Sequence, residues 1–291
     1  MSLFRKKEKT KRADAEKRTI QEERKYLLTE KSDFFIREAY KTLRTNTSFA
    51  LGGEEGCKVI VVTSSLQGEG KSITAVNLAI SYAMTDRKVL LIDCDLRRPK
   101  LARLLQMNAK TGLSDLLINP KNKAEAIIRT KVENLDVILS GKIPPNPSEL
   151  LGSTQMKQLL EEMKENYDYI FLDSPPVNMV TDAVVLAPES DGVLFLVRAN
   201  QSERGAVIRA VEQLEYAKIK ILGFVLNGTD VERSRYGYKK YRYRRYYYGK
   251  YAYGRYGYGY RKRGYGYGYS STIPPEDLMF SKQEGSRAED E

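Results

Sequence analysis

The fold is decided by the stretch T-S-S-L-Q-G-E-G-K-S, which spans residues 63–72. An apolar run precedes it, and an apolar pattern with helical spacing follows it. Glycines let the backbone bend so that successive N–H groups face an anion, and a helix N-terminus adds a positive dipole. The stretch matches G-x-x-x-x-G-K-[ST], except that Ser65 replaces the first glycine. It therefore predicts a phosphate-binding loop; the alternative is a glycine-containing turn with a chance Lys-Ser pair.

Two side chains of this loop would hold ATP and Mg²⁺. Lys71 can reach the β- and γ-phosphates, and the hydroxyl of Ser72 can ligate Mg²⁺. A loop of this kind works only between a strand and a helix. The surrounding sequence supplies both.

Acidic residues end two further apolar runs. In V-L-L-I-D-C-D-L-R-R at residues 89–98, the side chains of Asp93 and Asp95 are expected on the same side of an extended chain, because side chains alternate along a strand. Cys94 then points to the opposite side, where it is expected to be a small buried apolar residue. In Y-I-F-L-D-S-P-P at residues 169–176, Asp173 has the place of a Walker B acid. Open α/β sheets bind ligands at this edge, and three carboxylates beside a triphosphate imply Mg²⁺. Each acid alone could equally cap a strand end or a helix.

The remaining pattern alternates between strands and helices. Near-continuous apolar runs, which are typical of strands covered on both faces, predict strands at Lys58–Thr63, Lys88–Asp93, Leu135–Leu139, Tyr169–Asp173, Gly192–Arg198 and Ile219–Leu226. Helical patterns lie at Gly70–Met84, Pro99–Leu105, Ser153–Asn166, Asp182–Ala187 and Arg204–Tyr216. An amphipathic helix is predicted at Ser32–Phe49, capped by Ser32 or Asp33, with Phe35, Ala39 and Leu43 on one side. The predicted fold class is α/β: a P-loop NTPase with a doubly wound, mostly parallel sheet and helices on both faces.

Composition excludes several classes of function. The 291 residues include no histidine, which removes Ser-His-Asp and Cys-His catalysis and the usual zinc sites. Two cysteines argue against a disulfide scaffold and fit a reducing cytosol. The sequence contains no run of about 18 apolar residues, so no membrane span is predicted. The start of the chain is basic but lacks the apolar stretch that a secretory signal requires.

The net charge of +11 belongs to the C-terminal part. Residues 233–275 carry twelve Lys or Arg and no Asp or Glu, so the rest of the chain sums to 11 − 12 = −1. Residues 236–269 hold 15 of the 21 tyrosines and no Ile, Leu, Val or Phe, so this tail is expected to be disordered. The predicted organisation is a charged arm at 1–31, a P-loop domain at 32–232, a basic Tyr/Gly-rich tail at 233–272 and an acidic disordered end at 273–291.

These motifs resemble those of the bacterial tyrosine kinases (BY-kinases) of capsule and exopolysaccharide synthesis, of the Firmicutes type in which the kinase is a separate cytosolic chain. The resemblance covers about residues 33–229 and the tyrosine cluster. Further marks are G-L-S-D-L-L at 112–117, P-P-N-P-S-E-L-L at 144–151, D-S-P-P at 173–176 followed by Asp182, and V-L-N at 225–227. The proline-rich mark is the most specific of them.

The resemblance implies roles for individual residues. Lys71, Asp93, Asp95 and Asp173 are the implied catalytic residues, and Ser72, Asp93 and Asp173 the implied metal ligands. Implied ATP-binding residues are Gly68, Glu69, Gly70, Lys71, Ser72, Ile73 and Asn227. In the family, a helix with the pattern E-x-x-R-x-x-R forms a ring of subunits; here Glu38, Lys41 and Arg44 occupy this pattern, with Lys41 in place of the first arginine. Because a lysine forms a less directional ion pair than an arginine, the ring is expected to be weaker. Gln67 stands where many members have proline, which should alter loop rigidity more than chemistry.

The tail is the expected substrate of the kinase. The implied phosphorylation sites are Tyr236, Tyr238, Tyr241, Tyr243, Tyr246, Tyr247, Tyr248, Tyr251, Tyr253, Tyr256, Tyr258, Tyr260, Tyr265, Tyr267 and Tyr269. Interleaved arginine and tyrosine is also what single-strand nucleic-acid binders use, so the alternative role of the basic tail is to bind nucleic acid or an anionic surface. The alternative for the domain is a septum-positioning or plasmid-partition ATPase, but Leu66 stands where those proteins carry an extra lysine.

The family pattern also implies partners. These are a transmembrane activator supplied in trans, neighbouring copies in a homo-oligomeric ring and a cognate tyrosine phosphatase. The expected location is the cytosol, peripherally at the inner face of the cell membrane through the activator. The expected function is control of polysaccharide synthesis or export by autophosphorylation in trans.

Overall fold

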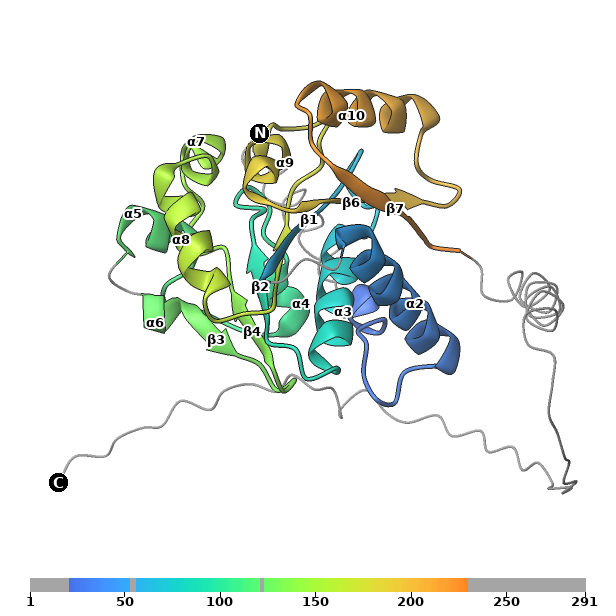
Figure 1. The fold of residues 1–291 in the computed structure, drawn as a ribbon, viewed down its shortest axis with the longest axis horizontal. Coiled ribbons are helices and arrows are strands. Elements are labelled where there is room, and N and C mark those ends of the chain that lie inside the picture. The colour runs from blue at the N-terminus through green and yellow to red at the C-terminus, as the bar shows by residue number, and fades with distance from the viewer. Residues whose placement is uncertain (1–20, 53–55, 121–122, 230–291) are drawn as a thin grey trace, which may run out of the picture. The chain divides into compact units, whose positions relative to one another are not determined.

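The structure of the protein, a computed structural model, describes residues 21–52, 56–120 and 123–229 (Figure 1). A seven-stranded sheet in the order β3-β4-β2-β5-β1-β6-β7 forms its centre. Its strands are β1 (Lys58–Ser64), β2 (Val89–Asp93), β3 (Ile127–Arg129), β4 (Leu135–Ile138), β5 (Tyr169–Asp173), β6 (Gly192–Arg198) and β7 (Ile221–Asn227). All neighbours are parallel except β3 and β4. The predicted doubly wound, mostly parallel sheet is confirmed.

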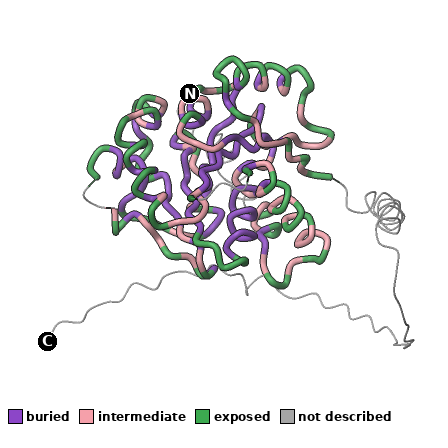
Figure 2. The backbone as a smooth tube through the Cα atoms, viewed as in Figure 1, coloured by how far each residue is buried: buried purple, intermediate pink, exposed green. Residues whose placement is uncertain are grey.

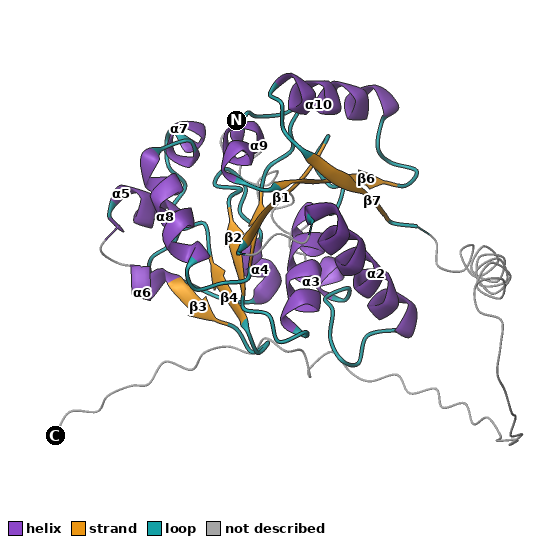
Figure 3. Cartoon of the chain, in the orientation of Figure 1, coloured by secondary structure: helices purple, strands orange, loops and turns teal. Residues whose placement is uncertain are grey.

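Helices cover both faces of the sheet. They are α2 (Phe34–Leu51), α3 (Lys71–Ala83), α4 (Leu101–Leu105), α5 (Leu113–Ile118), α6 (Lys123–Ala126), α7 (Pro147–Leu151), α8 (Thr154–Lys164), α9 (Asp182–Leu186), the 3₁₀ turn η2 (Ala187–Glu189) and α10 (Arg204–Tyr216). In the described part of the chain, none of them combines the length and apolar character needed to cross a bilayer. The alternation of strand and helix along the chain is visible in Figure 3.

Two hydrophobic cores lie on opposite faces of the sheet. Val59 and Val61 of β1 pack into the core beneath α8, α9 and α10, whereas Ile60 and Val62 pack into the core beneath α2, α3 and α4. Every residue of β1 is buried, and the sheet forms the buried centre in Figure 2. Full burial of an aliphatic side chain contributes about 1.5–3 kcal/mol, so this strand is held firmly from both sides. It can therefore carry the loop at its carboxyl end in a fixed position.

Helix α2 confirms the predicted cap but not the predicted packing face. The side chain of Asp33 accepts a hydrogen bond from the Phe35 amide at 2.8 Å. The residues that pack on the core are Ile36, Tyr40, Leu43, Thr47 and Leu51, while Ala39 is exposed. The expectation that placed Ala39 with Leu43 was wrong because the true stripe begins one residue later.

Five short elements were not predicted: α5, β3, α6, α7 and η2. Helix α5 begins after Gly112, whose amide donates to the Asp115 carboxylate at 3.0 Å. A Cβ on Gly112 would lie 2.2 Å from the Gly141 amide nitrogen, so the close approach of the two backbones requires glycine here. Helix α7 begins with Pro147, a residue suited to a first turn. Both helices lie in motifs that the sequence singled out, but with five or six residues they show no periodicity.

Candidate nucleotide and phosphotransfer site

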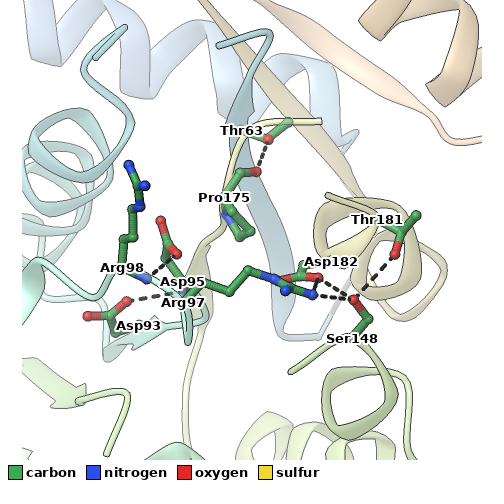
Figure 4. Close-up of polar contacts among 9 residues, drawn as sticks. All are labelled: Thr63, Asp93, Asp95, Arg97, Arg98, Ser148, Pro175, Thr181 and Asp182. Atoms are coloured by element: carbon green, nitrogen blue, oxygen red, sulfur yellow. Dashed lines mark hydrogen bonds and ion pairs between the residues drawn. The ribbon is translucent and has the colours of Figure 1, made fainter. Parts of the chain in front are cut away.

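The ends of three neighbouring strands form the site. Strand β5 lies between β2 and β1, and Asp93 at the end of β2 is the register partner of Asp173 at the end of β5. The phosphate-binding loop leaves the end of β1, and its first residue, Thr63, donates through its hydroxyl to the Pro175 carbonyl at 2.8 Å (Figure 4). The topology thus brings the two strand-end acids and the loop together, as the sequence predicted.

A buried carboxylate holds the loop from beneath. The side chain of Glu69 is 1% exposed and accepts hydrogen bonds from the hydroxyl of Ser65 at 2.8 Å and the amide of Leu66 at 2.8 Å. The hydroxyl of Ser202 donates to it as well. Ser65 therefore has a structural reason to replace the usual glycine, because its hydroxyl fastens the first turn of the loop. The side chain of Glu69 points into the protein, so it can meet a nucleotide only through its backbone.

Two residues from neighbouring strands fix the second half of the loop. Asn227 at the end of β7 donates to the Glu69 carbonyl at 3.0 Å, and Arg198 at the end of β6 donates to the Gly68 carbonyl at 2.7 Å. Gly70 has a φ of 95°, and a Cβ there would lie 2.0 Å from the Asn227 amide nitrogen. Asn227 therefore supports the loop from the side, and its contact with ATP stays a prediction.

Gly70→Ala is expected to raise the dissociation constant for ADP at least about tenfold, because a positive φ costs an alanine about 1–2 kcal/mol and the new methyl group displaces Asn227. Calorimetric titration with Mg²⁺–ADP measures the change. Gly223→Ala is the matched control, since nothing lies within 4 Å of a Cβ at that position of β7. Equal affinity in wild type and Gly70→Ala would contradict the role of Asn227.

The charged groups of the site are buried close together. Lys71 is 7% exposed, and burial lowers the pKa of its ammonium although Asp173 and Asp95 raise it. Burial and the neighbouring carboxylates of Asp173 and Asp95 raise the pKa of Asp93 well above its ordinary value. Burial also raises the pKa of Asp173 to about 7, against the opposing effects of Lys71 and the Ser72 hydroxyl. In all three groups burial is the largest cause of the shift, because it disfavours the charged form.

The clearest sign of a missing partner is Asp173. Neither of its buried carboxylate oxygens accepts a hydrogen bond of normal geometry from the described residues, although the Ser72 hydroxyl approaches closely enough to lower its pKa. A buried acceptor without a partner costs about 1–3 kcal/mol and more when charged. A hard cation at this position would satisfy both oxygens. Asp93 differs, since it accepts hydrogen bonds from the amides of Leu101 at 3.2 Å and Asp95 at 3.3 Å.

Within the described residues, no three acidic or thiol side chains surround one point as a complete metal cage would. Mg²⁺ is commonly held by one or two carboxylates together with substrate phosphates and water. Ser72 and the two strand-end acids supply protein ligands for such a site. The chemistry of the donors therefore suits a metal that arrives with a nucleotide.

A cleft of about 240 Å³ opens beside the loop. Of the predicted residues, Gly68, Gly70, Lys71, Ser72, Ile73 and Asp95 line it. Pro175 and Pro176 from the D-S-P-P motif form part of its wall. Asp95 is thus the predicted acid that an incoming group can reach.

Sequence reasoning left out a network that joins three of the quoted motifs. The guanidinium of Arg97 donates to both carboxylate oxygens of Asp182, at 2.9 and 3.1 Å, and to the Ser148 hydroxyl at 2.9 Å. Ser148 in turn donates to Asp182 at 2.5 Å (Figure 4). The motifs contained these residues, but no spacing along the chain shows that Arg97, Ser148 and Asp182 meet. In a second link, the guanidinium of Arg98 donates to the side-chain amide oxygen of Gln67 at 2.7 Å and ties the segment of Asp93 and Asp95 to the phosphate-binding loop.

The predicted ring residues make contacts within their own chain. Lys41 pairs with Glu38 at 2.8 Å, and Arg44 donates to the backbone carbonyl of Ser81 and, at 3.2 Å, to its hydroxyl. The predicted phosphorylation sites lie outside the described residues.

Comparison with known proteins identifies the family. The family model described as an AAA domain matches residues 57–221. The tyrosine-protein kinase YwqD of Bacillus subtilis is 39% identical over 202 residues, which are 69% of this chain and 85% of the relative. The solved kinase domain of Escherichia coli tyrosine kinase ETK is 32% identical with a TM-score of 0.64, covering 77% of this chain and 80% of that one.

A third comparison concerns the rival ATPase class. The septum site-determining protein MinD from Pyrococcus horikoshii OT3, solved with Mg-ADP, is 23% identical with a TM-score of 0.51 over 58% of this chain and 70% of that one. Its likeness is one of fold alone. By contrast, the likeness to the kinases extends to sequence over most of their length. The chain belongs to the bacterial tyrosine-protein kinases.

Proposed function

We propose that this tyrosine kinase uses Mg²⁺–ATP to phosphorylate the tyrosine cluster at its own C-terminus. The observation that carries the proposal is the buried, unpartnered carboxylate of Asp173 beside Lys71 and the phosphate-binding loop. A cation-binding acid next to a loop of amides that faces a cleft suits the polyphosphate of a nucleotide. Bound there, Mg²⁺ would neutralise the charge that develops on the phosphates.

The residues have separate tasks in this proposal. The ammonium of Lys71 binds the β- and γ-phosphate oxygens, and Ser72, Asp93 and Asp173 hold the metal. The tyrosine oxygen attacks the γ-phosphorus as the bond to the β-phosphate oxygen breaks and ADP leaves. Asp95 accepts the phenol proton, because it lines the cleft whereas Asp93 is fully buried and already accepts two backbone amides. Transfer then depends on alignment and charge neutralisation.

The tail offers acceptors at high local concentration because it is joined to the enzyme or to a neighbouring copy. Transfer in trans fits a ring built through Glu38, Lys41 and Arg44. Since Arg44 is tied to Ser81 within the chain, its guanidinium would present only its remaining donors to a neighbour.

The resemblance supports a role of this kinase in the control of capsule or exopolysaccharide synthesis or export. Its further partners would be a transmembrane activator that recruits it to the inner face of the cell membrane and a tyrosine phosphatase that reverses the modification.

The test is to incubate the full chain with ATP and Mg²⁺, with and without the cytosolic segment of a candidate activator, and to map phosphate by mass spectrometry. We expect phosphate on several of the tyrosines between residues 236 and 269 and none without Mg²⁺. Release of inorganic phosphate without labelled tyrosine would favour the ATPase alternative. Salt-dependent binding of single-stranded RNA by an unlabelled tail would favour the nucleic-acid role.

A further inference from the structure

The segment before α2 reaches the nucleotide cleft. Residues 21–28 fall in the predicted N-terminal arm, yet Glu23 lines the cleft together with the phosphate-binding loop. Its carboxylate lies 3.7 Å from the ammonium of Lys100, and each of the two side chains is 24% exposed. Lys100 lies just before α4 and lines the same cleft. An acidic side chain therefore stands in a cleft that is built for anions.

The segment is fixed to the domain and does not merely lie on it. Leu27 and Leu28 are each 3% exposed and belong to the core beneath α3 and α4. The buried side chain of Asn77 accepts from the Leu28 amide at 2.7 Å and donates to the Tyr26 carbonyl at 2.8 Å. Arg24 donates to the Leu104 carbonyl at 3.1 Å. These contacts hold the segment to both α3, which begins at Lys71, and α4, which follows Lys100.

Lys100 stands close to the charges that define the phosphate position. Its side chain lines the same cleft as Lys71, Ser72 and Asp95. A cation that faces the same cleft as Lys71 has the position of a second phosphate ligand. In the structure its carboxylate partner is Glu23, and a bound polyphosphate would compete with that carboxylate for the same ammonium.

We propose that Lys100 is a second phosphate-binding cation of the nucleotide site and that Glu23 is its competing counter-ion, so that residues 21–28 form a strap whose Glu23 carboxylate opposes nucleotide binding. This inference rests on the proposed nucleotide site. When phosphate oxygens engage Lys100, the carboxylate of Glu23 loses its partner and stands beside like charge. The strap thereby couples the N-terminal segment to occupancy of the site.

The test uses calorimetric titration of the full chain with Mg²⁺–ADP, which binds without turnover, at fixed low salt. Glu23→Gln is expected to lower the dissociation constant about two- to fivefold, as expected for loss of a partly exposed ion pair. Lys100→Gln should raise it about tenfold, the loss of one charge-assisted hydrogen bond, and Lys100→Arg should stay within about twofold of wild type. In the double variant the gain from Glu23→Gln should disappear.

Each control variant removes a charge of the same sign from a residue that does not line the cleft. Glu22→Gln affects a surface pair with Lys25, and Lys110→Gln removes an exposed ammonium that does not line the cleft. Neither should change the dissociation constant. If Glu23→Gln binds ADP no more tightly than Glu22→Gln, or if its gain persists without Lys100, the counter-ion role is wrong. If Lys100→Gln binds like wild type, Lys100 is no phosphate ligand. Absence of ADP binding by the wild type would instead overturn the proposed function itself.

Discussion

Lys71→Met is expected to lower tyrosine phosphorylation by at least about 10²–10³-fold, because it removes a preorganised charge from the position where phosphate charge develops. The fold should survive the change. Lys71 is 7% exposed and burial lowers its pKa, so the nucleotide-free protein holds this cation at a cost. An apolar side chain of similar length removes that cost, so the free energy of unfolding without nucleotide should stay equal or increase.

The measurement pairs phosphate mapping with urea denaturation of the same samples. Lys110→Met, at an exposed position away from the cleft, serves as the control for the substitution itself. Unchanged phosphorylation in Lys71→Met would remove the proposed phosphate site. A large loss of stability would show instead that Lys71 has a structural role, and its activity could then no longer be interpreted.

The centre of the fold and of the site could be predicted because both depend on local order in the sequence. Every strand of the sheet except the three-residue β3 is an apolar run long enough to recognise, and a parallel sheet gathers its carboxyl ends at one edge. Asp93 and Asp173 are 80 residues apart in sequence, yet as the last residues of their strands they become register partners. The proximity of these acids to the phosphate-binding loop followed from that rule alone.

Contacts between segments without a repeating pattern could not be predicted. The Arg97, Ser148 and Asp182 network joins a loop, a five-residue helix and the start of another short helix. Only the folded backbone brings them together. The N-terminal segment is a second example, since Leu27 and Leu28 are an isolated apolar pair whose burial depends on Asn77 of α3. Likewise, the role of Ser65 became clear only from the buried carboxylate beneath it.

Asp173→Asn is expected to lower kinase activity while it raises the stability of the metal-free protein. It should lower phosphorylation at least about 10²-fold, since an amide is a poor Mg²⁺ ligand in place of a carboxylate. In metal-free protein at pH 8, however, it should raise the free energy of unfolding by about 1–3 kcal/mol, because a buried charge without a hydrogen-bond partner is removed.

The gain in stability should depend on pH. The pKa of Asp173 rises from 3.8 to about 7 on folding, so between these values the folded chain holds a proton that the unfolded chain has released. The contribution of Asp173 to stability therefore falls as pH rises through this window, and its full penalty is present above about pH 7. Asparagine does not titrate. The advantage of the variant should thus be large at pH 8 and shrink as pH falls toward 5.

Denaturation by urea in chelator at pH 5 and pH 8 measures both effects, and Asp182→Asn is the matched comparison. Asp182 is also fully buried, but Arg97 and Ser148 donate to its carboxylate. Removing that charge leaves the Arg97 guanidinium without its ionic partner, so the same substitution should destabilise the protein. If Asp173→Asn is also destabilising at pH 8, its carboxylate is satisfied within the protein alone, and the position next to Ser72 is not a place that waits for a metal ion.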